Sequence, residues 1–532
     1  MKSKFWRQGE PYVWGTGLSL SLIILLMFVM LYAVIGKGVA AFWPADLVEC
    51  RLGSGLKVIG EITGTETIHG SEQKRFQFKI GNRDLYGLDF RWIDERDMGP
   101  ITYPLEVYVL ERQEYGDFYG YLKFLDQRLL KVSPAKKSGN ILADAIEAVS
   151  PLRKNVSELN DRIVELNYEV ERTGILLKKM EHSGLGESER AQELKLEVEY
   201  LKDNFTDIVE TLNEKQAELS SYKAVFTDAG GREKEISIND IVRFYQPNKM
   251  TALEKLLYYG QRLRELFFDE PRESNTEGGL FPAIFGTIML IFLMSIFSFP
   301  LGVVGGIYLR EYARDGFFVR TVRIAVNNLA GIPSIVYGIF GLGFFVYGIG
   351  SQIDLFFFPE RLPIPTFGTG GIFWASLTLG LLTVPVVIVA TEEALGAIPP
   401  GIREGSQALA ATKFQTLTML LLPMASPGIL TGFILAMARA AGEVAPLMIT
   451  GVVKLAPALP LDSHFPFLHL DRKFMHLGFH IYDIGFQSPN VEAAKPMVYV
   501  TTLLLILIVV LMTSLAIYLR NKMRARYSVV DV

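Results

Sequence analysis

Two charged residues, Arg439 and Glu443, interrupt an apolar run that extends from about 416 to 453. They stand four residues apart, which places both side chains on one face of a helix. A charge at the centre of a bilayer costs about 2.5–3.5 kcal/mol, so such residues usually face a cavity or each other. The guanidinium of Arg439 offers paired donors that match the oxygens of phosphate. We therefore expect the pair either to line a path for an anion or to form a structural ion pair that fixes helix packing.

The second candidate site is the segment 392–423, which joins two apolar runs. It contains a polar helix at 402–412 with small residues on one side, and it ends with the step Leu422-Pro423. On these features alone the segment is either a connecting loop or a docking element.

The same segment resembles the EAA signature of ABC-transporter permeases. Glu404, Gly405 and Ser406 stand where that signature has Glu-Ala-Ala, and Ala410 stands where it has a glycine. The resemblance implies a coupling helix that inserts into a separate ATPase subunit. With alanine in place of glycine, we expect a shallower bend at Ala410. The implied coupling residues are Glu392, Glu393, Arg403, Glu404, Gly405, Ser406, Ala410 and Lys413.

The chain lacks the sequence patterns of several catalytic sites. It contains no Walker A motif, no HExxH, no GxSxG and no CxxC, so we expect no ATP hydrolysis and no directly bound cofactor. Cys50 is the one cysteine, and His464, His469, His476 and His480 match no tight ligand spacing, so no metal site is expected. A formal net charge of −4 gives no support for a nucleic-acid partner.

The elements that must position these residues are membrane-spanning helices. Half of the residues are hydrophobic, and they are gathered into long runs with few or no charges. About 20 apolar residues cross the hydrocarbon layer of a bilayer. Runs of this kind predict six spans, at 11–36, 278–309, 324–353, 362–391, 416–453 and 496–519. The first run is longer than the apolar core of a signal peptide, so we expect a retained anchor.

Basic residues in the flanks indicate how the spans are oriented. They cluster at 2–7, at 310–323 and at 520–526. Because lysine and arginine are enriched on the cytoplasmic side, we expect both termini to be cytoplasmic. The basic residues of the loop 454–495 oppose this topology, and the three clusters outweigh them.

A large insert, 42–277, separates the first two spans, and this topology places it in the periplasm. Residues 42–135 and 224–247 alternate with a period of two and are expected to form one β-rich domain. Residues 145–222 carry two apolar stripes with four–three spacing, which predicts an antiparallel coiled-coil hairpin about 40 Å tall. The hairpin is expected to be either a docking arm for a soluble partner or a structural spacer.

Two smaller features complete the sequence prediction. An amphipathic helix is expected at 251–268, with Leu253, Leu256, Leu257 and Leu263 on one side. Pro333 and Pro423 are expected to break helices within the membrane region.

Two further strings, 329–345 and 429–448, resemble the permease subunits of phosphate transporters, and the second is most similar to the PstA family. The resemblance covers 278–532 well and 1–41 loosely, and it does not cover the insert. It implies a role in transport for Arg439. The implied partners are phosphate, a second permease subunit (PstC-like), a dimer of ATPase subunits (PstB-like) that carries ATP and Mg, and a periplasmic phosphate-binding protein (PstS-like).

We therefore predict an all-α polytopic membrane protein of six transmembrane helices, with the permease core of a type I ABC importer and a β-rich plus coiled-coil insert. The predicted parts are a tail and first span at 1–41, the insert at 42–277, the permease core at 278–519 and a cytoplasmic tail at 520–532.

The expected function is import of inorganic phosphate across the inner membrane, coupled to the ATPase through 392–415. The alternatives are transport of another oxyanion and a membrane-anchored sensor or scaffold that acts through the insert. An ion-coupled carrier would need inverted repeats and more intramembrane acids, and the sequence shows neither.

Overall fold

The computed structural model describes residues 6, 9–68, 72–126, 128 and 140–527. Within these residues six helical segments are long and apolar enough to cross a membrane: Glu10–Ala40, Phe281–Tyr312, Ser334–Phe357, Ile372–Gly396, Lys413–Ala441 and Val491–Ala525. The predicted number of spans is confirmed. Most of the basic cluster at 2–7, residues 129–135 of the predicted β segment and residues 528–532 of the tail lie outside the described residues.

Three predicted boundaries are wrong. The third span begins at Ser334 instead of 324, because residues before Pro333 form a separate helix, α9 (Phe317–Leu329). The fourth begins at Ile372 instead of 362, and the fifth ends at Ala441 instead of 453. Apolar composition alone does not mark these ends, since the adjoining loops and short helices are apolar as well.

The central helix of the bundle is α12 (Ile372–Gly396), which packs against α8 (Phe281–Ile307) and α15 (Leu422–Ala441). A Cβ added at Gly306 of α8 would lie 2.6 Å from the Cβ of Thr391 on α12. A Cβ at Gly432 of α15 would lie 2.1 Å from the Cβ of Ala390 on α12. Small residues therefore let both neighbours approach the central helix closely, as is common where helices pack in membranes.

The membrane region contains further helices besides these three. The third span is composite, because a π-helical stretch, Gly341–Gly350, lies between its two α-helical parts. The other helices are α10 (Ser334–Phe340), α11 (Ser351–Phe357), α13 (Pro400–Ala408), α14 (Lys413–Thr416), α16 (Ala445–Thr450), α17 (Leu477–Tyr482) and α18 (Val491–Tyr527).

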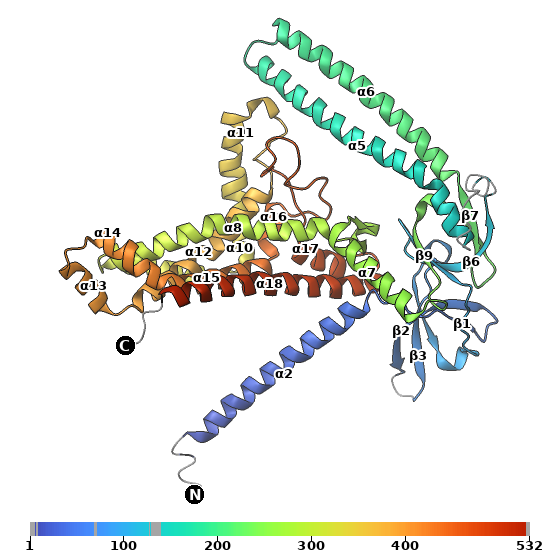
Figure 1. The fold of residues 1–532 in the computed structure, drawn as a ribbon, viewed down its shortest axis with the longest axis horizontal. Coiled ribbons are helices and arrows are strands. Elements are labelled where there is room, and N and C mark those ends of the chain that lie inside the picture. The colour runs from blue at the N-terminus through green and yellow to red at the C-terminus, as the bar shows by residue number, and fades with distance from the viewer. Residues whose placement is uncertain (1–5, 7–8, 69–71, 127, 129–139, 528–532) are drawn as a thin grey trace.

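The first spanning helix, α2 (Glu10–Ala40), leaves the bundle at an angle (Figure 1). Its C-terminal end packs on α18, where Gly38 lies beside Tyr499 and Leu503. The Lys37 ammonium donates a hydrogen bond to the Tyr499 hydroxyl at 3.3 Å. Most of the apolar surface of α2 is therefore exposed in the isolated chain.

The insert contains two antiparallel sheets. The four-stranded sheet has the order β1-β2-β3-β4, and the five-stranded sheet has the order β8-β7-β6-β5-β9. The strands are β1 (Val48–Arg51), β2 (Lys57–Thr67), β3 (Lys74–Lys79), β4 (Phe90–Asp94), β5 (Tyr108–Arg112), β6 (Phe118–Leu125), β7 (Lys223–Thr227), β8 (Glu233–Ser237) and β9 (Ile241–Tyr245). A short helix, α3 (Arg83–Tyr86), joins β3 to β4, and a two-stranded ribbon of β10 (Pro271–Arg272) and β11 (Glu277–Gly278) precedes α8.

Two long helices, α5 (Ile141–His182) and α6 (Glu189–Ser220), stand between the neighbouring strands β6 and β7 (Figure 1). They pack against each other, and buried residues of the predicted stripes, Leu166, Leu194 and Leu201, lie between them. At the base, Leu142 and Leu219 join the core of the five-stranded sheet. The strands after the helix pair therefore complete the sheet that begins before it.

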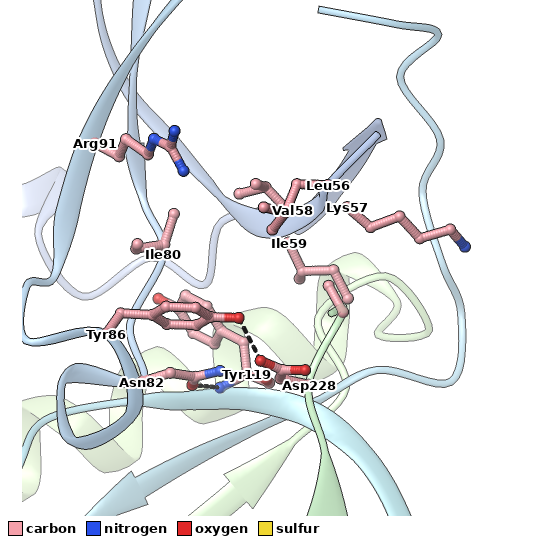
Figure 2. Close-up of a pocket in the computed structure, with 11 residues that line it drawn as sticks. Leu56, Lys57, Val58, Ile59, Ile80, Asn82, Tyr86, Arg91, Tyr119 and Asp228 are labelled. Atoms are coloured by element: carbon pink, nitrogen blue, oxygen red, sulfur yellow. Dashed lines mark hydrogen bonds between the residues drawn. The ribbon is translucent and has the colours of Figure 1, made fainter. Parts of the chain in front are cut away.

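Hydrogen bonds between buried polar groups join the two sheets of the insert (Figure 2). The Asn82 amide donates to the Tyr119 carbonyl at 3.0 Å and accepts from the Tyr119 backbone N–H at 2.7 Å. The Tyr86 hydroxyl donates to Asp228. The adjoining cavity of about 30 Å³ has room for little more than one water molecule. The residues around it therefore serve to pack the two sheets against each other.

The insert contacts the membrane region at several points. The Tyr168 hydroxyl of α5 donates a hydrogen bond to the Phe465 carbonyl at 2.9 Å, and its ring packs at a tilt against the His464 ring, with the ring centres 4.1 Å apart. Lys179 lies 3.5 Å from Glu360 in the loop after the third span. The Asn275 amide donates to the Lys454 carbonyl at 2.7 Å. Both the helix pair and the β-rich part therefore rest on the loops at one end of the bundle.

Candidate substrate path and coupling surface

Arg439 and Glu443 form an ion pair, with the Arg439 Nε 3.5 Å from the Glu443 Oε1. The expectation that one helix carries both residues is wrong, because α15 ends at Ala441 and Glu443 lies in the break before α16. Gly442 and Pro446 explain the break, since glycine weakens a helix and proline removes a backbone donor and disfavours helical backbone before it.

The break at 442–444 packs against the start of the third span. A Cβ at Gly338 of α10 would lie 2.7 Å from the Cα of Pro446. Pro333 immediately precedes α10, and Tyr337 on its first turns donates a hydrogen bond to the Leu329 carbonyl at 2.7 Å. Two interrupted helices therefore meet beside Arg439, and backbone of this kind can reorient without disturbing a continuous helix.

The side chain of Arg439 is 39% exposed and that of Glu443 is 19% exposed. The guanidinium is thus at the surface of the isolated chain.

Pro423 does not end a helix. It follows a π-helical turn, Leu417–Leu421, within the continuous segment Lys413–Ala441. A wide turn before a proline relieves the clash of the ring with the preceding turn, so the helix continues past it.

The segment between the fourth and fifth spans forms two short helices, α13 and α14. Ala410 joins them with a φ of 62°, a left-handed conformation. The Ala411 N–H bonds to the Ser406 carbonyl at 3.2 Å and the Ala410 N–H to the Gln407 carbonyl at 2.9 Å, which is a Schellman cap. The expectation of a shallower bend is therefore wrong, because alanine adopts the conformation that glycine would take, at a cost of about 1–2 kcal/mol.

Several predicted coupling residues hold the segment in place. Arg403 contacts Glu311 at 2.8 Å and donates to the carbonyls of Leu395 at 2.7 Å and Ile398 at 2.9 Å. The Ser406 and Thr416 hydroxyls lie 2.9 Å apart, which joins α13 to α14.

Two other predicted residues have partners on α9 and at the end of the second span. Glu392 accepts from the Arg323 Nε at 2.7 Å. Lys413 donates to the Glu311 carbonyl, and its ammonium lies 4.9 Å from the centre of the Tyr312 ring.

Other residues of the segment face outward. Glu393, Glu404 and Gly405 are exposed, and so are two large apolar side chains, Leu409 at 86% and Phe414 at 66%. Sequence reasoning missed Leu409, Phe414 and the anchors Glu311 and Arg323. Leu409 and Phe414 could have been found from the sequence, because they are large apolar residues in a polar segment. No spacing rule connects Glu311 to Arg403.

The four histidines of the last long loop take part in packing. His469 contacts Asp462 at 3.0 Å, and His480 contacts the Asn275 carbonyl at 3.1 Å and the Thr501 hydroxyl at 3.2 Å. Burial lowers the pKa of both His476 and His480 to about 4. Among the described residues no group of three or more metal-ligating side chains is brought together.

Six spanning helices with a short helix pair between the fourth and fifth define a membrane-embedded permease. Residues 298–525 match the family described as binding-protein-dependent transport system inner membrane component. This chain belongs to that family.

Curated relatives support the assignment. The chain is 31% identical over 223 residues to the probable ABC transporter permease protein YqgI of Bacillus subtilis, which covers 41% of this chain and 70% of that protein. It is 32% identical over 195 residues to YqgH of the same organism, covering 36% and 59%. It is 34% identical over 189 residues to the probable phosphate transport system permease protein PstA of Methanocaldococcus jannaschii, covering 35% and 60%. The chain thus spans about 60% of the length of the last two relatives.

A solved structure of the MetNI methionine ABC transporter, in an inward-facing conformation, aligns with a TM-score of 0.34 and 20% identity. The alignment covers 45% of this chain and 94% of that chain. This similarity is too weak to add to the family assignment.

Proposed function

We propose that this chain is a permease subunit of an ATP-driven importer and that its substrate is inorganic phosphate. The observation that carries the proposal is the Arg439–Glu443 pair at the helix break, on the surface of a family member whose relatives include phosphate permeases named PstA. The bound anion would take the place of the Glu443 carboxylate as the partner of Arg439.

The chemistry of arginine supports this role. A guanidinium is charged at all physiological pH values and presents a planar set of donors that matches two oxygens of one phosphate. In a passage of low dielectric constant, such a partner lowers the barrier for an anion that otherwise has none. Glu443 keeps Arg439 neutralised when no anion is present.

ATP hydrolysis would occur on a separate dimer of ATPase subunits that binds ATP and Mg. The outward-facing residues Glu404, Gly405, Leu409 and Phe414 would contact that subunit. Arg403 would act within this chain, since its guanidinium is occupied by Glu311 and two carbonyls. The ion pair of Arg403 with Glu311 connects the coupling segment to the end of the second span. A movement of the coupling segment would thereby be passed to a membrane-spanning helix.

The proposed topology places both termini in the cytoplasm and the insert in the periplasm of an inner membrane. The arrangement in Figure 1 supports it, because the C-terminal end of α18 and the helices α13–α14 lie at one end of the bundle and the insert lies at the other. A periplasmic phosphate-binding protein would deliver the anion at the insert end, and a second permease subunit would complete the path. Nucleic acid has no part in this function.

Transport by the purified complex in proteoliposomes tests the proposal. With the binding protein present, uptake of labelled phosphate should require ATP and should persist in an excess of sulfate. Equal inhibition by sulfate would assign the chain to a broader group of oxyanions. A complex that assembles with its ATPase but moves no anion would favour the sensor or scaffold alternative.

A further inference from the structure

The helix α7 (Ala252–Phe268) directs a row of large apolar side chains away from the protein and several charged side chains toward it. Leu253, Leu256, Leu257 and Phe268 are 67%, 57%, 61% and 70% exposed. Their spacing, together with Phe267, places them on one face of the helix. The sequence prediction placed Leu253, Leu256 and Leu257 on one side together with Leu263, which is half-buried, and it did not include Phe267 and Phe268. The structure shows that the exposed stripe is directed away from the protein.

The opposite face of α7 is anchored by a buried polar network. Arg262 lies 2.9 Å from Glu111 and 2.6 Å from Glu265, and Arg243 lies 3.2 Å from Glu265. Glu111 and Glu265 are both 4% exposed. Rotation of the helix about its axis would separate these partners and leave buried charges unpaired, which is costly. The network therefore fixes that rotation. The apolar stripe therefore cannot turn inward.

The position of α7 indicates the surroundings of the stripe. Its polar side contacts the residues that follow the first spanning helix: Lys255 lies 2.6 Å from Asp46, and the Arg262 guanidinium lies 5.1 Å from the centre of the Phe42 ring. Leu266, at its other end, packs with Leu280 and joins the core at the start of α8. The helix thus lies between the end of one spanning helix and the start of the next (Figure 1).

We propose that α7 is an interfacial helix, with the stripe of Leu253, Leu256, Leu257, Phe267 and Phe268 embedded in the lipid leaflet on the side of the insert. A row of large exposed apolar side chains on a helix with a charged opposite face is typical of helices that lie in the plane of a membrane surface. By its spacing Arg264 falls on the same face of the helix; it is exposed, and among the described residues it has no hydrogen-bond or ion-pair partner. Its guanidinium would bind the phosphate of a lipid headgroup.

Fluorescence quenching in the full chain tests the proposal. Cys50 is buried and is replaced by alanine, and a polarity-sensitive probe is attached to Leu256→Cys. The matched control is Leu185→Cys at the tip of the helix pair, because Leu185 is 55% exposed and Leu256 is 57% exposed. Phe268→Cys gives a second position on the stripe. Each variant is measured in vesicles of zwitterionic phospholipid, both as the single chain and in the assembled transporter.

Nitroxide carried near the headgroup of the lipid should quench the probe at position 256 about threefold or more strongly than the probe at 185. Iodide in the water should show the reverse order, and position 268 should behave as 256. Free access of iodide to 256 and 268 would overturn the proposal. Lipid quenching that disappears on assembly would also overturn it, because the stripe would then be covered by a partner subunit.

Discussion

The guanidinium of Arg403 lies 2.8 Å from the carboxylate of Glu311, and this ion pair joins the coupling segment to the end of the second span. Glu404, the next residue, points outward and is exposed. Adjacent residues of the same helix thus have different surroundings, one within the chain and one at its surface.

These surroundings predict two distinct defects. Arg403→Gln removes a charge-assisted anchor, so it should destabilise the coupling segment and lower its hydrogen-exchange protection. Glu404→Lys reverses a charge at the proposed ATPase contact, so it should weaken ATPase binding and leave that protection unchanged. Hydrogen exchange of residues 398–416 and co-purification of the ATPase measure the two effects. Equal loss of protection in both variants would contradict the assignment.

Ala410 predicts a stabilising substitution. Because its φ of 62° is left-handed, Ala410→Gly should stabilise the cap by about 1 kcal/mol, and Ala410→Val should destabilise it. The amide of Ala411, which closes the cap, should exchange about fivefold more slowly in the glycine variant, provided that local opening governs exchange. Unchanged exchange in Ala410→Gly would show that the left-handed turn does not limit the stability of the segment.

The helix pair α5–α6 should be removable from the permease region. Residues 158–214 can be replaced by a short Gly-Ser linker, because β6 and β7 remain adjacent and Leu142 and Leu219 stay in the sheet core. The shortened chain should insert into membranes and assemble with its partner permease. Its contacts at Phe465 and Glu360 would be lost, so reduced transport with normal assembly is the expected result. Failure to insert would show that the helix pair belongs to the folding core.

Two buried histidines predict acid sensitivity. Burial lowers the pKa of His476 and His480 to about 4, below the ordinary value of about 6.5, so the folded chain favours the neutral rings. Below pH 6.5 the unfolded chain binds more protons, and stability should fall as the pH drops from about 6.5 to about 4. His480→Gln should reduce this slope in thermal unfolding, whereas His182→Gln, at the exposed tip of α5, should not. An unchanged slope in the His480 variant would assign the acid sensitivity to other groups.

Sequence patterns predicted the number of spans, because charge-free runs of about 20 residues have few alternatives. They also predicted the helix pair within a β-rich domain, because the spacing of hydrophobic residues changes from a period of two to a period of about three and a half. They placed Arg439 and Glu443 on one helix because an apolar run hides the break that Gly442 and Pro446 produce. They did not show which way the stripe on α7 faces, because lipid and protein core favour the same side chains.

The pairings across long stretches of chain were beyond such patterns as well. The contact of Arg403 with Glu311 and of Glu392 with Arg323 depends on how the spans pack, and neither pair has a local spacing that would reveal it.

Whether Arg439 meets the transported anion is tested by phosphate uptake and thermal stability of the double variant Arg439→Gln, Glu443→Gln. Arg439→Gln alone should abolish ATP-driven uptake and reduce stability, because it leaves the partly buried Glu443 without its partner. Arg439→Lys, which keeps the charge and loses the planar donors, should reduce uptake in a complex that still assembles. If Arg439 meets the anion, the double variant regains stability while phosphate uptake into proteoliposomes stays lost. Recovery of uptake in the double variant would show that Arg439 serves only to pair with Glu443, and would contradict a contact between Arg439 and the transported anion.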